Sequence, residues 1–336
     1  MNQLSVVILN FNGQDYLRQF LPTVLQCSSG HEVVVADNAS TDDSVKLMRE
    51  EFPEVRLLQF DENHGYSGGY NEAIARIESR YIVLLNSDVE VTPDWIEPVL
   101  EVLEADEDIA AAQPKIRDYK DKPLFEYAGA SGGFIDQLAY PFCRGRIFHT
   151  IETDEGQYED TREVFWASGS ALFVRRECYL EAGGLDEDFF AHMEEIDLCW
   201  RFWNMGKKVM VCPKSTIFHV GGGTLHKSHP RKTYLNFRNG LSLLLKNEKA
   251  TALWWKLPLR LLLDWAAAAH FSFYSGIKHA AAIFRAHLHF FGSFFIHVKK
   301  RQKVMNRRTK LPRYRGLIIW QYFAKGRKHY SQVPNR

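Results

Sequence analysis

The sequence predicts an α/β fold in which a mostly parallel sheet is flanked by helices. In the first 114 residues, short runs rich in Val, Leu and Ile alternate with segments of helix length. Strand, helix and strand at this spacing form βαβ units, and such units build parallel sheets. Polar and acidic residues directly follow several of the apolar runs. This places them at the carboxyl ends of strands, where open α/β sheets bind ligands.

The apolar runs define the expected strands, and the segments between them define the expected helices. A short run of branched apolar residues indicates a strand that is buried on both faces. Strands are expected at residues 4–10, 31–36, 55–60, 81–85 and 109–114, and helices at 14–26, 42–51 and 69–79. Another helix is expected to begin at Pro93, because Thr92 and Pro93 supply an N-cap and a first-turn proline.

The chain then leaves the sheet and returns to it. Residues 115–162 carry Gly, Asp, Lys and Tyr without sustained periodicity, so we expect an excursion from the sheet there. A strand is expected at 164–174, a helix at 193–205 that ends at Gly206, and a strand at 208–212 closed by Pro213. From Leu241 to about Val298 the composition predicts helices rich in Leu, Ala, Phe, Trp and His, followed by a basic tail.

The composition indicates a globular protein with reduced cysteines. Of the 336 residues, 46% are hydrophobic and 25% are charged, which allows one large domain or two. The first predicted strand begins almost at Met1 with no basic leader or cleavage site before it, so a cytosolic protein is expected. The five cysteines are widely spaced and form no CxxC pair, which predicts free thiols and no zinc site.

The net charge of +1 hides a division along the chain. Residues 240–336 hold 19 of the 42 Lys and Arg but only 2 of the 41 acidic residues, Glu248 and Asp264. This asymmetry indicates a polyanionic partner, and no recognised nucleic-acid module is present, so we expect a membrane surface and no nucleic acid. The uncharged stretch between Asp264 and Lys278 is too short to span a bilayer, which needs about 20 apolar residues.

The helices expected at 250–298 combine several tryptophans with cations, and a basic cluster at 299–315 follows them. Helices of this composition can lie in the membrane interface, with their cations toward anionic headgroups. The alternative is that these helices pack on the preceding domain or on a dimer partner and that the tail is solvated.

Acidic and glycine-rich segments stand at three expected strand ends. Asp88 and Glu90 follow the run 81–85 and offer hard oxygen ligands of the kind that Mg²⁺ or Mn²⁺ prefers. Asp37 follows the second strand and would face the same crevice. The turn at 63–71 is rich in glycine and could present its amides to an anion, although it lacks the GxGxxG and P-loop spacings. Each segment alone is also compatible with an ordinary turn.

In order and spacing, these segments resemble glycosyltransferase family 2, whose members are inverting enzymes of the GT-A fold. The resemblance is strongest to the bacterial rhamnosyltransferase-like branch and spans residues 3–245. The matching blocks are VVILNFNG at 6–13, DNASTD at 37–42, residues 63–71, LLNSD at 84–88, ASGSALFVRR at 167–176, GLDEDFF at 184–190, EEIDLCWR at 194–201 and HVGG at 219–222.

The resemblance implies a GT-A nucleotide-sugar-binding domain at 1–245, with a donor half at 1–114 and an acceptor and catalytic half at 115–245. A helical, basic region at 246–336 would follow. By position, the implied contacts to the nucleotide-sugar are Asn10, Asn12, Asp37, Asn63, Gly65 and Asn86. Asp88 matches the family's metal-binding aspartate, and Glu90 and His219 stand where further metal ligands can occur. A lone histidine after a strand can equally be structural.

The resemblance also implies a carboxylate base. Glu194-Glu195 occupies the place of a Glu-Asp pair whose second residue is the usual base. Glu195 departs from that pattern, so Glu194 and Asp197 also stay open as the base, and an acidic first turn favoured by the helix dipole is the structural alternative. Trp166 is expected to shape the acceptor site unless it belongs to the core. Arg238 is expected to pair with the diphosphate or to cap a helix.

The expected activity is metal-assisted transfer of a sugar from a UDP- or dTDP-sugar to a hydroxyl of a glycan or lipid-linked acceptor in cell-surface polysaccharide synthesis. A peripheral place on the inner face of the cytoplasmic membrane is expected with it, and a homodimer is compatible with it. A sugar nucleotidyltransferase is disfavoured, because Asn10-Phe11-Asn12-Gly13 is not a basic, glycine-rich phosphate loop. A catalytically silent scaffold that binds a membrane or a partner is the remaining alternative.

Overall fold

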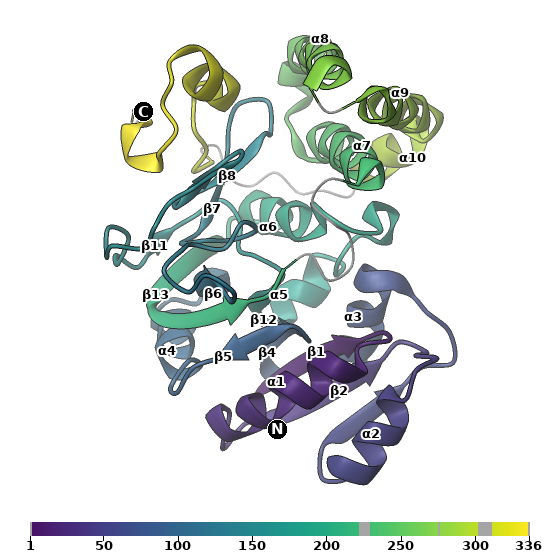
Figure 1. Cartoon of the computed structure of the whole chain (residues 1–336), viewed down its shortest axis with the longest axis vertical. Coiled ribbons are helices and arrows are strands. Elements are labelled where there is room, and N and C mark those ends of the chain that lie inside the picture. Colours follow the sequence, from purple (N-terminus) through teal and green to yellow (C-terminus); the bar gives the residue numbers. More distant parts are fainter. Residues whose placement is uncertain (1, 222–228, 275, 302–310, 335–336) are drawn as a thin grey trace.

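A nine-stranded mixed sheet runs through residues 2–219 of the computed structural model, which describes residues 2–221, 229–274, 276–301 and 311–334 (Figure 1). Its strands are β1 (Asn2–Asn10), β2 (Glu32–Asp37), β3 (Arg56–Gln59), β4 (Ser79–Asn86), β5 (Val89–Val91), β6 (Ile109–Asp118), β11 (Arg162–Glu163), β12 (Ala171–Arg175) and β13 (Lys208–His219). Their order is β11-β13-β6-β12-β4-β1-β2-β3, and β5 pairs with β13.

The half of the sheet formed by β3, β2, β1 and β4 is parallel, as the alternating pattern predicts. The register pairs Asn10 with Asp37 and Leu9 with Asn86. The carboxyl ends of three predicted strands therefore meet at one edge. β12 continues the sheet beyond β4 in the antiparallel direction.

Helices cover both faces of the sheet, because successive side chains of the buried strands point to opposite faces. Val6 and Ile8 join the core on one face, and Val7 joins the core on the other. The first face is covered by α1 (Gln14–Cys27), α2 (Ser44–Glu51) and α4 (Glu97–Ala105), and the second by α3 (Gly65–Ala75), α5 (Arg176–Glu181) and α6 (Glu194–Asn204). This arrangement confirms the predicted α/β class.

The expected helix start at Pro93 is wrong, because α4 begins at Glu97. The residues between form a turn in which Asp94 has a positive φ of 55°. This turn buries Trp95 completely, and the Trp95 indole donates to Ser28 Oγ at 3.3 Å. Burial of a large aromatic side chain outweighs the local capping signal of Thr92 and Pro93.

Three other boundaries differ from expectation. The glycine-rich turn is itself the first turn of α3, so that helix lies at Gly65–Ala75 and not at 69–79. The expected strand 164–174 enters the main sheet only from Ala171 onward, as β12 (Ala171–Arg175), because the backbone of Trp166 pairs with Gly133 instead. Strand β13 continues past Pro213 to His219, with a register shift after Cys212 where a proline is tolerated.

The excursion after β6 contains a small antiparallel sheet, and the end of the described chain packs on it. Its strands are β7 (Gly133–Ile135), β8 (Pro141–Cys143), β9 (Arg146–Ile147) and β10 (Thr150–Ile151). The backbone N–H of Tyr314 donates to Ile135 O at 2.9 Å, and that of Ile318 donates to Asp136 Oδ2 at 2.9 Å. Residues 311–334, which include short helical turns at Trp320–Ala324 and Tyr330–Gln332, are thus folded and do not form a solvated tail.

Four helices gather at one end of the molecule: α7 (Pro230–Asn247), α8 (Ala250–Tyr274), α9 (Ile277–Gly292) and α10 (Phe294–Arg301) (Figure 1). The expected boundary between 245 and 246 falls within α7. Within the described ranges, no helix is long and apolar enough to cross a membrane. Lys303, Arg307, Arg308 and Lys310 of the expected basic cluster lie outside the described residues.

Candidate functional site

Asn10 and Asp37 form a buried pair at the ends of β1 and β2. Asn10 Nδ2 donates to Asp37 Oδ2 at 3.0 Å, and the Ser40 N–H donates to Asp37 Oδ1 at 2.9 Å. The parallel register brings the two side chains together. Asn10 Oδ1 is buried and has no hydrogen-bond partner among the described residues. A buried acceptor left unpaired is costly, and a ligand's donor could satisfy it.

A second set of amide contacts fixes the loops beside this pair. Asn12, with a positive φ of 52°, accepts hydrogen bonds from the Thr41 and Asp42 N–H groups at 2.7 and 3.3 Å. Asn38 donates to Asn63 Oδ1 and to Gly65 O, each at 3.0 Å. The structure therefore gathers five of the predicted nucleotide-sugar residues at one edge, and it adds Asn38, which the sequence analysis did not single out.

Asp88 and His219 meet at the end of β4, beside the sixth predicted contact, Asn86. His219 Nε2 lies 3.1 Å from Asp88 Oδ1 and 3.4 Å from Asn86 Nδ2. On the other side of the ring, Nδ1 lies 3.5 Å from Glu126 Oε1 and 3.1 Å from Ser170 Oγ. Glu126 comes from the excursion, and no local sequence signal marks it.

The surroundings of His219 and Asp88 favour the charged form of each side chain. Burial disfavours the imidazolium, but hydrogen bonds and charges from Asp88 and Glu126 outweigh burial and raise the pKa of His219 to about 10. Burial likewise opposes ionisation of Asp88, yet the His219 contact holds the pKa of Asp88 below its ordinary value. Gly222, which closes the matching block after His219, lies outside the described residues.

Glu90 does not join this cluster. On β5, Val89 and Val91 point into the core, and the carboxylate of Glu90 instead pairs with Lys122 Nζ at 2.5 Å. The expectation that Glu90 is a second metal ligand is therefore not supported by its placement. Within the described ranges, no group of three or more His, Cys, Asp or Glu side chains could hold a metal ion.

Glu194 and Glu195 open α6 as predicted, in surroundings that favour the protonated acid. Burial raises the pKa of Glu194 well above its usual range, and the neighbouring charge of Glu195 adds to the effect. Burial also raises the pKa of Glu195, to about 7, although backbone N–H groups oppose the rise. In each side chain, Oε2 has no hydrogen-bond partner among the described residues. A carboxylate with a near-neutral pKa and a free oxygen is suited to act as a general base.

Gly169 and Ser170 lie between Glu195 and the end of β4. A methyl group added to Gly169 would stand 3.9 Å from Cβ of Glu195, so the two residues lie next to each other. The next residue, Ser170, accepts the Asn86 N–H at 3.0 Å through its carbonyl and touches His219 through its hydroxyl. Gly169 lies beside Glu195, and the next residue, Ser170, bonds to Asn86 and His219. The candidate base is therefore close to the cluster of Asn86, Asp88 and His219.

Comparison with known protein families agrees with this geometry. The family model described as "Glycosyl transferase family 2" matches residues 5–179, which is more than half of the chain. The chain belongs to glycosyltransferase family 2. The match contains the strand ends with Asn10, Asp37 and Asp88, and it stops before Glu195, His219 and α7.

Curated relatives of this glycosyltransferase include rhamnosyltransferases. It is 28% identical over 281 residues to the N-acetylglucosaminyl-diphospho-decaprenol L-rhamnosyltransferase of Mycobacterium tuberculosis, covering 76% of this chain and 88% of the relative. It is 24% identical over 223 residues to rhamnosyltransferase WbbL of Escherichia coli K12, covering 64% of this chain and 82% of the relative.

Solved structures share the fold of this glycosyltransferase at low sequence identity. The mannosyltransferase PcManGT of Pyrobaculum calidifontis, solved with GDP-Man and Mn²⁺, has a TM-score of 0.51 at 16% identity and covers 90% of this chain and 84% of its own. GalNAc-T7, solved with UDP, GalNAc and Mn²⁺, has a TM-score of 0.56 at 16% identity over 73% of this chain; the match spans only 48% of GalNAc-T7. The expected GT-A fold is confirmed.

Three predicted residues of this glycosyltransferase have other partners. Asp197 is fully buried, and Lys246, Arg201 and Asn247 bind its carboxylate, which leaves it unsuited to be the base. Arg238 binds backbone carbonyls of residues 188 and 189 and not an open anion site. Trp166 is 2% exposed and donates its indole N–H to Phe134 O at 3.0 Å, so it is a core residue and no acceptor platform.

Proposed function

We propose that this glycosyltransferase moves a sugar from a nucleoside-diphosphate donor to a hydroxyl of a glycan or lipid-linked acceptor, with inversion, and that Glu195 is the base. The observation that carries the proposal is the position of the half-buried Glu195, whose Oε2 is enclosed and unpaired, next to Gly169 and so near the Asn86, Asp88 and His219 cluster. The base and the polar strand ends thus face one shared region.

The edge formed by β1, β2 and β4 is suited to the nucleoside part of the donor. Asn10, with its unpaired buried Oδ1, and Asp37 would contact the base and ribose, and Asn12, Asn63, Gly65 and Asn86 would line the same pocket. The rhamnosyltransferase relatives make dTDP-L-rhamnose the first donor to test and a UDP-sugar the second.

A divalent ion, Mg²⁺ or Mn²⁺, fits the residues present at the diphosphate end. Asp88 offers a carboxylate oxygen at a strand end, and His219 would offer a ring nitrogen once it gives up the proton that Asp88 and Glu126 favour on it. Such hard ions usually take one or two protein ligands and complete their shell with water and substrate phosphates, so a cage of three protein ligands is not needed. When bound, the ion stabilises negative charge on the leaving diphosphate as a Lewis acid.

In the proposed reaction, Glu195 accepts the proton that the acceptor hydroxyl loses. The acceptor oxygen forms a bond to the anomeric carbon on the face opposite the diphosphate, and the bond to the diphosphate oxygen breaks with both electrons leaving on that oxygen. Glu195 takes the proton that the acceptor hydroxyl loses. Its unpaired Oε2 is the atom that receives this proton.

Two matched substitutions test the assignment. Donor binding is measured by calorimetry with dTDP-L-rhamnose and with UDP-sugars, with and without Mn²⁺, and turnover is measured as release of the nucleoside diphosphate in the presence of N-acetylglucosaminyl-diphospho-decaprenol. We expect Glu195→Gln to bind the donor normally and to lose turnover at least 100-fold. Asp88→Asn should lose the metal-dependent part of donor binding. Wild-type turnover by Glu195→Gln would refute the base, and wild-type turnover by Asp88→Asn would refute the metal site.

We also propose that the helices after α7 place the enzyme on an anionic membrane surface, on the inner face of the cytoplasmic membrane. Large apolar side chains are exposed on α8 and α9 at helical spacing and continue into α10. They are Trp254, Leu262, Trp265, Phe273, Ile277, Phe284, Leu288, Phe291, Phe295 and Ile296. Such stripes can be buried in the headgroup region of a bilayer.

The charges of this region fit the same surface. Glu248 and Asp264, the two acidic residues after residue 240, are 2% and 0% exposed and are bound by Lys256, Arg313 and Arg260. Exposed charged side chains beside the apolar stripes, such as Lys278, Arg285 and Lys299, are basic. Each such cation contributes about 1 kcal/mol near an anionic leaflet.

Vesicle sedimentation tests the membrane proposal. The full chain should bind vesicles that contain phosphatidylglycerol at low salt, and Phe273→Ser combined with Phe295→Ser should weaken binding at least tenfold. Leu180→Ser, which changes an exposed leucine on α5, is the matched control and should bind normally. A stable dimer in solution that leaves vesicles unbound would instead assign these stripes to contacts between two copies of the chain.

A further inference from the structure

The loop that leads into Glu194 and Glu195 has an unfavourable backbone. Phe190, His192 and Met193 have positive φ angles of 63°, 68° and 76°, although none of them is glycine. A non-glycine residue in such a conformation is strained and persists only where surrounding contacts impose it. The contacts that hold this loop therefore also decide where α6 begins.

One amide of α7 supplies most of these contacts. The two hydrogens of Asn239 Nδ2 are shared among the carbonyl oxygens of Phe189 at 2.9 Å, Ala191 at 2.9 Å and His192 at 2.7 Å. Asn239 is 1% exposed, so no water competes for these bonds. A single buried side chain thus holds carbonyls on both sides of Phe190.

Arg238 orients that amide and also donates hydrogen bonds to the loop itself. Its Nε donates to Asn239 Oδ1 at 2.7 Å, which fixes the direction in which the Asn239 NH₂ group points. Its Nη2 donates to Asp188 O at 2.9 Å and Phe189 O at 2.8 Å. Residues 188 to 192 are therefore bound through their backbone to two consecutive residues of α7.

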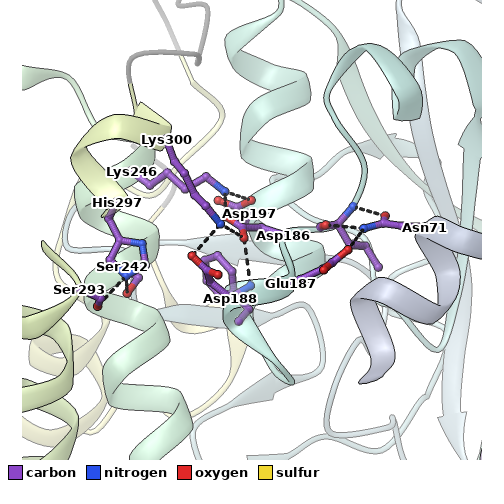
Figure 2. A network of polar contacts seen from close by, with 12 residues as sticks. Asn71, Asp186, Glu187, Asp188, Asp197, Ser242, Lys246, Ser293, His297 and Lys300 are labelled. Carbon is purple, nitrogen blue, oxygen red and sulfur yellow. Dashed lines mark hydrogen bonds and ion pairs between the residues drawn. The ribbon is translucent and has the colours of Figure 1, made fainter. Parts of the chain in front are cut away.

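Ion pairs from α7 and α10 hold the beginning of the same loop (Figure 2). Lys246 Nζ lies 2.6 Å from Asp186 and 2.7 Å from Asp197. Lys300 Nζ lies 2.5 Å from Asp186 and 2.7 Å from Asp188. Burial disfavours the Asp186 carboxylate, but the charges of Lys246 and Lys300 outweigh burial and lower its pKa. Both ends of the loop are thereby held by helices that lie beyond the family match.

We infer that Asn239, oriented by Arg238, is a positioning residue for Glu195: it imposes the backbone of residues 189–192 and so sets where the Glu195 carboxylate stands. The inference depends on the proposed role of Glu195 as the base. Asn239 bonds only to the chain in this arrangement, and its effect on the reaction passes through the start of α6. A misplacement of a reacting group by about 1 Å can lower the rate about 100-fold.

The test compares Asn239→Ala and Arg238→Ala with two controls. Arg238→Lys keeps a donor for the loop carbonyls, and Ser242→Ala removes a buried hydroxyl from the same helix without touching the loop. Turnover with dTDP-L-rhamnose or the UDP-sugar selected by calorimetry should fall about 100-fold in Asn239→Ala and recover in part from Arg238→Ala to Arg238→Lys. Donor binding should change less than twofold in all four variants.

The pH profile separates positioning from a general loss of structure. A released loop admits water to Glu195, so the midpoint of the rise in turnover with pH should move from about 7 toward the ordinary glutamate value in Asn239→Ala. Wild-type turnover and midpoint in Asn239→Ala would overturn the inference. If that variant does not fold, Arg238→Ala gives the same readouts. Full turnover by Glu195→Gln would refute the base itself, an outcome distinct from normal behaviour of Asn239→Ala.

Discussion

The carboxylate of Glu195 has a pKa raised by burial, and this gives the protein a pH signature. Burial raises its pKa to about 7 in the folded protein. An unfolded glutamate titrates near 4.5, so the folded state holds the proton more strongly. Protonated Glu195 therefore contributes fully to the free energy of unfolding below about pH 4.5, and this contribution is lost as the pH rises through 7.

Turnover should rise with pH around a midpoint near 7, because the base must be ionised. Glu195→Gln should abolish this rise and also stabilise the fold at pH 9 by a few degrees in Tm, since the neutral amide has no charge to bury. Thermal unfolding of wild type and variant at pH 5 and pH 9 measures the second effect. Equal Tm differences at the two pH values would contradict a raised pKa of Glu195.

Trp166 is expected to matter for stability and not for acceptor specificity. Its ring lies over Gly133, where an added methyl group would stand 2.0 Å from the indole. Trp166→Ala should destabilise the fold by about 3–5 kcal/mol, and Gly133→Ala should also destabilise it through overpacking. Denaturant unfolding measures both changes. A Trp166→Ala variant with native stability and altered acceptor preference would restore Trp166 to the acceptor site.

At the scale of elements, Lys246 and Lys300 make similar ion pairs in different surroundings. Lys246 is buried and joins α7 to Asp197 of α6, whereas one third of the Lys300 side chain is exposed. Lys246→Ala should cost about 3–5 kcal/mol, because it leaves two buried aspartates with fewer cations. Lys300→Ala should cost about 1 kcal/mol or less, since water replaces its charge. Urea unfolding of both variants measures the two losses of stability. Equal losses for Lys246→Ala and Lys300→Ala would contradict this account.

The sheet could be predicted from sequence because its signals are local. Asp37 and Asp88 directly follow apolar runs, and Glu195 opens an amphipathic helix, so each stands in a recognisable context. The contacts of Asn38, Glu126 and Asn239 depend on partners far along the chain; Asn239, for example, binds Phe189 across 50 residues. The burial of Trp95 and Trp166 could not be predicted from local sequence either. Because of it, α4 begins later than expected and the segment around Trp166 does not join the main sheet.

At the scale of the whole molecule, residues 311–334 link the small antiparallel sheet to the helices that follow residue 230. Arg313 binds buried Glu248, and Ile318 is completely buried beside Asp136. Arg313→Ala should therefore lower the free energy of unfolding by about 1–3 kcal/mol, whereas Arg315→Ala, at an exposed position, should have no measurable effect. Differential scanning calorimetry compares the two. Equal stability of both variants would show that this segment contributes little.

The burial of Glu248 and Asp264 has a consequence for how the molecule behaves in an electric field. With 19 basic residues and no exposed acid after residue 240, and an acidic excess before it, we expect the protein to have an uneven charge distribution despite a pI of about 7.7. It should stay bound to a cation exchanger above its isoelectric point, with the helical end toward the resin. A negatively charged surface that it approaches will meet that end first, whereas a positively charged one will meet the acidic part.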